Sequence, residues 1–131
     1  MKNILLATLL LSGITFANDT AKVKRIQTMQ NMETAMSTIQ KGFMYNSREM
    51  IKSGIEKLKY NTTDLQAFEV ANDKDKQFKA KDFAIAESKA IATLADQILV
   101  DFDNNKKEAV LGEYSKLQNQ CVTCHMIVRR W

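Results

Sequence analysis

The 131-residue sequence contains no proline and only four glycines. A chain without proline has no residue that forces a helix to break or kink. Leucine, alanine, methionine, lysine, glutamine and glutamate are plentiful, and all of them favour helix. No strand pattern, internal repeat, low-complexity segment or interdomain linker is visible in the sequence. We therefore expect a single all-α domain.

Cysteine and histidine are also scarce. The chain has two cysteines and one histidine, and all three lie within residues 121–125. A tetrahedral zinc site would need a fourth ligand, and no second cysteine pair or second histidine supplies one. No Ser/His/Asp set, paired carboxylates or glycine-rich phosphate loop stands out. These gaps argue against hydrolase and transferase chemistry, and we do not expect an enzyme.

The charge pattern argues against nucleic-acid binding. The formal net charge is +4 at pH 7, with 19 basic and 15 acidic residues. The two signs are interspersed along the chain, without a block of Lys and Arg and without aromatic interleaving. Proteins that bind nucleic acid usually gather their basic residues into a patch or stripe. We therefore expect no nucleic-acid partner.

Residues 1–17 have the pattern of a secretory signal peptide. A lysine at the second position gives a positive start, residues 4–11 are mostly apolar, and Thr15 and Ala17 place small residues before a cleavage site. Cleavage there would leave residues 18–131 as the mature domain, and an uncleaved N-terminal anchor is the alternative. No second apolar run reaches membrane length, so we expect an exported, periplasmic protein without stable membrane insertion after cleavage.

The segment Cys121-Val122-Thr123-Cys124-His125 matches C-x-x-C-H, the attachment signature of a c-type haem. In such sites the two thiols add to the haem vinyl groups and the imidazole becomes the proximal iron ligand. A redox disulfide is the alternative for an exported C-x-x-C pair, but that motif usually follows a strand in a βαβ unit. We expect one covalent haem c per chain, attached at Cys121 and Cys124, with His125 on the iron.

Apolar residues at three- and four-residue spacing predict four helices. Short connections between them predict an antiparallel up-down-up-down four-helix bundle, a class that holds cofactors in its core. The predicted helices cover about residues 20–45, 47–60, 77 or 82 to 103, and 106 onward.

On each predicted helix, the regularly spaced apolar residues form one stripe that faces inward, here called the seam. Ser47 is the expected N-cap of the second helix, and Thr62-Thr63-Asp64 are expected to cap a short turn after it. The seam of the last helix passes through both cysteines, so a haem attached there would lie against the bundle interior. The expected seam positions are Met29, Met32, Met36, Ile39 and Phe43; Ile51, Ile55 and Leu58; Ala84, Ile91, Leu94, Ile98 and Phe102; and Val110, Tyr114, Leu117, Cys121, Cys124 and Val128.

Residues 114–129 resemble the last helix of the class II c-type cytochromes, the family of cytochrome c′ and its low-spin relatives. The shared features are an upstream aromatic residue and leucine, here Tyr114 and Leu117, then C-x-x-C-H, then Arg129 four residues after the histidine. Val128 departs from the aromatic residue often found before that arginine. The resemblance implies a covalent haem on the C-terminal helix, and members of the family often form homodimers through their first two helices.

The first helix also resembles this family, in which an arginine stands four residues before the residue that faces the distal side of the iron. Arg25 and Met29 occupy those two positions. Met29 is therefore the candidate sixth ligand, with Met32 as the alternative, although methionine at helical spacing is more often core filler. Arg25 and Arg129 are candidate partners of the haem propionates, because a guanidinium matches a carboxylate in bidentate fashion.

Two functions are open to such a haem protein. With Met29 and His125 on the iron, it would carry electrons between redox proteins of the periplasm. If Ile26 faces the iron instead, a five-coordinate haem would bind nitric oxide or carbon monoxide. A third interpretation is an exported helical bundle without haem, in which the C-x-x-C-H match is accidental. We expect the electron carrier.

Overall fold

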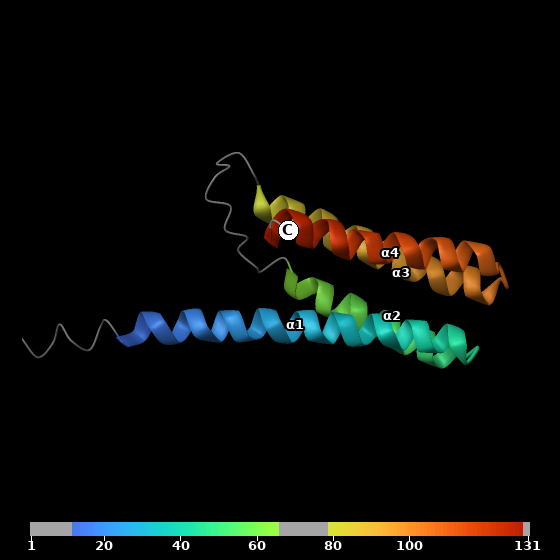
Figure 1. Ribbon diagram of the computed structural model, residues 1–131, viewed down its shortest axis with the longest axis horizontal. Coiled ribbons are helices and arrows are strands. Elements are labelled where there is room, and N and C mark those ends of the chain that lie inside the picture. Colours follow the sequence, from blue (N-terminus) through green and yellow to red (C-terminus); the bar gives the residue numbers. More distant parts are fainter. Residues whose placement is uncertain (1–11, 66–78, 130–131) are drawn as a thin grey trace, which may run out of the picture.

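The computed structural model describes residues 12–65 and 79–129, with side chains for residues 20–65 and 79–128. All regular structure in these two ranges is α-helix, as predicted, and the four helices are consistent with a four-helix bundle (Figure 1). The helices are α1 (Ser12–Met44), α2 (Arg48–Leu65), α3 (Ala80–Asp103) and α4 (Lys107–Arg129).

The helices pack as two hairpins that lie side by side. Helix α1 packs along α2, α3 packs along α4, and α2 joins the two hairpins by packing against α3. Figure 1 shows both hairpin turns at one end of the molecule and the C-terminal end of α4 at the other. Within the described helices, no Cα atom of α1 lies within 8 Å of one in α4.

Two glycines let α1 and α2 approach closely. A Cβ atom added at Gly54 would lie 2.6 Å from Ile39 Cγ1 and 2.9 Å from the Ala35 carbonyl oxygen. One added at Gly42 would lie 2.8 Å from the Ile51 backbone nitrogen. Any larger residue would therefore push the backbones apart, and glycine is the residue that permits this contact.

The two hairpin turns use asparagine in the left-handed backbone region. Asn46 has φ of 49° and Asn105 has φ of 56°, a conformation that asparagine tolerates better than most residues. The Ser47 hydroxyl accepts a hydrogen bond from the Met50 N–H at 3.3 Å, so the predicted N-cap of α2 is confirmed. Helix α3 ends at Asp103, as the sequence predicted.

Polar contacts also link α2 and α3, the two helices that join the hairpins. The Arg48 guanidinium binds the Asp103 carboxylate through two hydrogen bonds of 2.6 and 2.7 Å, and this contact lowers the pKa of Asp103. The buried Ser88 hydroxyl donates to the Thr62 carbonyl oxygen at 2.9 Å. The first contact is exposed and contributes little free energy, whereas the second satisfies a polar group inside the bundle.

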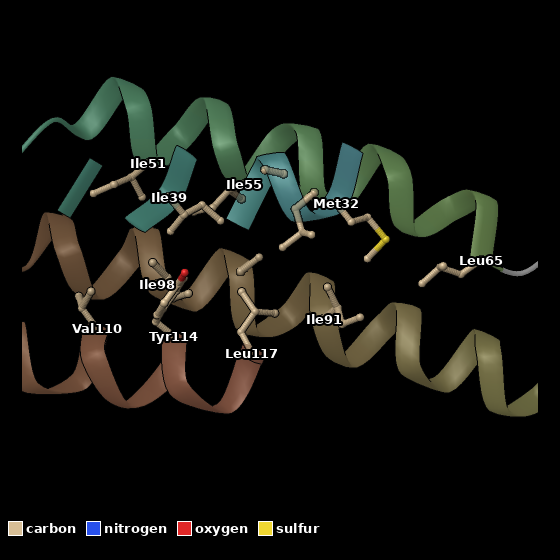
Figure 2. Close-up of a cluster of buried hydrophobic side chains, with 13 residues drawn as sticks. Met32, Ile39, Ile51, Ile55, Leu65, Ile91, Ile98, Val110, Tyr114 and Leu117 are labelled. Atoms are coloured by element: carbon tan, nitrogen blue, oxygen red, sulfur yellow. The ribbon is translucent and has the colours of Figure 1, made fainter. Parts of the chain in front are cut away.

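A single hydrophobic core joins all four helices. Figure 2 shows side chains from both hairpins pointing into one shared interior. Most of the predicted seam positions are buried there or pack against it, and this part of the prediction is confirmed. The largest fully buried side chains are Ile39, Ile51, Leu58, Ile91, Ile98 and Leu117.

The helix boundaries differ from the predicted ones in two places. Helix α1 begins at Ser12, before the expected start at about residue 20, and α2 continues to Leu65. The hydroxyls of Thr62 and Thr63 each donate at 2.7 Å to the carbonyl three residues earlier. The prediction that these threonines cap a separate turn was therefore wrong, because their side chains bond within α2 instead.

We predict that Gly54→Ala lowers the free energy of unfolding by about 1–3 kcal/mol, because the new methyl group would overlap Ile39 and the Ala35 carbonyl. Urea unfolding followed by far-UV circular dichroism measures this loss. Gly112→Ala is the matched control. Nothing lies within 4 Å of a Cβ added at Gly112, so its higher helix propensity should leave stability unchanged or raise it by up to about 1 kcal/mol. Equal effects of the two substitutions would contradict the close α1–α2 contact.

Candidate functional site

Helix α4 places the motif residues on the face that continues the core. Its seam runs from the buried Tyr114 and Leu117 to Cys121, Cys124 and His125, which are all half-buried. The two residues between the cysteines are exposed. This arrangement follows from helical geometry, since residues three and four apart share a face. The predicted register of the motif with the seam is confirmed.

The two cysteines are free thiols in a partly buried setting. Burial raises the pKa of both the Cys121 and the Cys124 thiol, and the negative charge of Glu87 on α3 raises both further. Redox-active C-x-x-C pairs have the opposite environment, because a helix N-terminus or a nearby cation lowers their thiol pKa. Burial and the Glu87 charge therefore both act against the formation of a reactive thiolate at these positions.

Glu87 is an acidic neighbour of the motif that was not predicted from the sequence. The Gln120 amide donates a hydrogen bond of 2.5 Å from Nε2 to Glu87 Oε2, and Gln120 directly precedes Cys121. Glu87 is half-buried and stands three residues after the buried Ala84 and four before the buried Ile91. That spacing places it beside the seam of α3, and the same spacing was visible in the sequence.

The methionines of α1 differ in burial. Met32 is 7% exposed, and Figure 2 shows its thioether pointing into the shared interior. Met29 and Met36 are half-buried and pack against the core. Thr28 and Ala35 are more buried than Met29 and Met36, the residues that follow them, so the buried strip of α1 is displaced slightly from the predicted one at these two positions. Met29 and Met36 lie at its edge.

Three candidate residues remain, namely Ile26, Arg25 and Arg129. Ile26, the distal residue of the gas-binding interpretation, is 47% exposed. Arg25 is half-buried, and it forms no hydrogen bond or ion pair with another described residue. Its neighbour Lys24 pairs with Asp64 of α2 at 3.1 Å. Arg129 is the last residue of α4, and its side chain lies outside the described part of the structure.

Tyr114 connects α4 to α1 across the interior. Its hydroxyl donates a hydrogen bond of 3.3 Å to the Met36 carbonyl oxygen. Its ring packs edge-on against Phe43, with centroids 5.3 Å apart and planes at 89°. Burial raises the pKa of Tyr114, and the charge of Cys121 adds to the rise. This contact aligns the two helices, whose backbones do not otherwise come close.

No protein-family model, curated protein or solved structure matches the chain. The described residues contain no group of three or more His, Cys, Asp or Glu side chains arranged to hold a metal ion. In the same ranges, no helix has the length and apolar character needed to cross a bilayer. The candidate site therefore rests on the motif, its burial and its neighbours.

We predict that Tyr114→Phe lowers the free energy of unfolding by about 1 kcal/mol, because it removes the hydrogen bond to Met36 and keeps the ring contact with Phe43. Chemical denaturation monitored by circular dichroism measures the change. Tyr60→Phe is the control, because Tyr60 is 74% exposed. Loss of its hydroxyl should change the free energy of unfolding by less than about 0.5 kcal/mol. A Tyr114→Phe protein as stable as the Tyr60→Phe control would show that the α1–α4 hydrogen bond contributes nothing.

Proposed function

We propose that the protein is a periplasmic, monohaem c-type cytochrome of the class II type that carries electrons. The observation that carries this proposal is the position of Cys121, Cys124 and His125 on one half-buried face of α4. When bound, haem supplies one-electron cycling between Fe(III) and Fe(II). The two thiols would hold it through thioether bonds, and the His125 imidazole would be the proximal ligand. Free thiols on a partly apolar face fit such a group.

The contact between Tyr114 and Met36 supports Met29 as the sixth ligand. In the proposed antiparallel up-down-up-down bundle, α1 and α4 run in opposite directions. A residue a given number of positions earlier on α1 therefore lies at the same level of the bundle as the residue that many positions later on α4. Seven residues are two helical turns on nearly the same face. Seven residues before Met36 is Met29, and seven residues after Tyr114 is Cys121. Met29 would therefore lie level with the first attachment residue, whereas Met32, the alternative ligand, would lie nearly one turn away.

Arginine side chains would complete the binding of the haem propionates. Arg25 is half-buried, has no ionic partner among the described residues, and lies one turn before Met29. Arg129 stands one turn after His125 on α4. A guanidinium binds a carboxylate through two parallel hydrogen bonds, so each arginine could hold one propionate at this end of the bundle.

Electron transfer is favoured over gas binding by the residues of α1. Ile26 is largely exposed, and Met29 packs against the core. A thioether ligand would fill the distal side and raise the reduction potential. Partner redox proteins in the periplasm would bind near the motif, where Val122, Met126 and Ile127 are exposed apolar side chains. A homodimer through α1 and α2 is part of the same proposal.

We predict that the mature protein, produced with a haem-maturation system, shows the spectrum of low-spin haem with thioether and imidazole ligands. The oxidised form should have the weak far-red band of sulfur–iron charge transfer, and the reduced form should have sharp, split visible bands. Broad high-spin bands that sharpen only with nitric oxide or carbon monoxide would contradict the electron carrier and favour gas binding. A colourless protein would contradict haem attachment itself.

We predict that Met29→Ala abolishes the far-red band and lowers the reduction potential, because the iron loses its thioether ligand. Met32→Ala should keep the band and lower stability by about 2–5 kcal/mol, because it leaves a cavity in the core. Met44→Ala is the control, since Met44 is 80% exposed and should affect neither property. Loss of the band in Met32→Ala with its retention in Met29→Ala would assign the ligand to Met32.

A further inference from the structure

The carboxylate of Glu87 is held beside the start of the motif. Its Oε2 atom accepts the 2.5 Å hydrogen bond from Gln120, the residue that precedes Cys121 on α4. This contact places the Glu87 carboxylate next to the first of the two residues that would bond the haem. The negative charge also raises the pKa of the Cys121 and Cys124 thiols, in addition to the effect of burial.

The Glu87 charge has no lysine or arginine partner in the described part of the chain. No ion pair joins it to a described lysine or arginine. By contrast, Glu113, earlier on α4, pairs with Lys116 at 2.9 Å. Glu87 is also half-buried beside the core positions Ala84 and Ile91. Charges in such a setting are screened less by water and salt than charges on the surface.

We propose that Glu87 sets the reduction potential of the haem by holding a negative charge beside the thioether bonds, an inference that rests on the proposed function. With haem bound, reduction would add one electron, supplied by a one-electron donor protein, to the iron. A nearby negative charge opposes that added electron and favours the oxidised form. The hydrogen bond from Gln120 holds the carboxylate at this position. Glu87 thus acts on the potential without being an iron ligand.

The test compares the reduction potentials of three holoproteins, the wild type, Glu87→Gln and Glu113→Gln, by spectroelectrochemical titration at one pH. Glu87→Gln removes the charge and keeps an oxygen that can accept the hydrogen bond from Gln120. We expect it to favour reduction by about three- to tenfold, where tenfold corresponds to about 59 mV for one electron. Glu113→Gln removes an equal charge about two turns from Cys121, and we expect a change below about twofold.

The spectra recorded during the same titrations distinguish the outcomes. A higher potential in Glu87→Gln with an unchanged far-red band supports the electrostatic role. An unchanged potential, a shift equal to that of Glu113→Gln, or a shift accompanied by loss of the far-red band overturns it. Each of these results leaves the proposed function standing. A wild-type protein that takes up no covalent haem overturns the proposed function, and the role of Glu87 falls with it.

Discussion

The spacing of three and four residues along α4 is the constraint on which both the core and the candidate site depend. It places Tyr114 and Leu117 in the core and, on the same face, Cys121 and Cys124 at its edge. A one-residue shift would turn the cysteines toward solvent and remove Leu117 from the core. The stability of the bundle and the placement of the motif are therefore not independent, because one helical face provides both.

The pairs of helices in the bundle approach one another to different degrees. Helices α1 and α2 touch closely because Gly54 has no side chain, whereas α1 and α4 meet through longer side chains such as Tyr114. A large cofactor attached to α4 would fit better between α1 and α4, where the backbones are farther apart, than between α1 and α2. Met29 and Arg25 of α1 and Glu87 of α3 are half-buried, and the ligand, propionate and electrostatic roles are proposals for these three side chains.

Local signals made much of this predictable from the sequence. Apolar spacing identified the four helices, and the Ser47 cap follows from its hydroxyl and position. The extension of α2 was missed because a threonine such as Thr62 can cap a helix or bond within it. The burial of Ala35 depends on the close approach at Gly54, a contact that local spacing does not encode. Glu87 was missed because a charged residue at seam spacing usually marks a polar flank.

The proposed function depends above all on covalent attachment of a haem at Cys121 and Cys124. Intact-mass spectrometry under denaturing conditions, on protein exported alongside a haem-maturation system, tests it most directly. We predict the mass of residues 18–131 plus one haem, and the mass of the unmodified chain for the Cys121→Ala/Cys124→Ala double variant. A wild-type mass without haem, or a haem that separates from the chain on denaturation, would rule out covalent attachment at these cysteines.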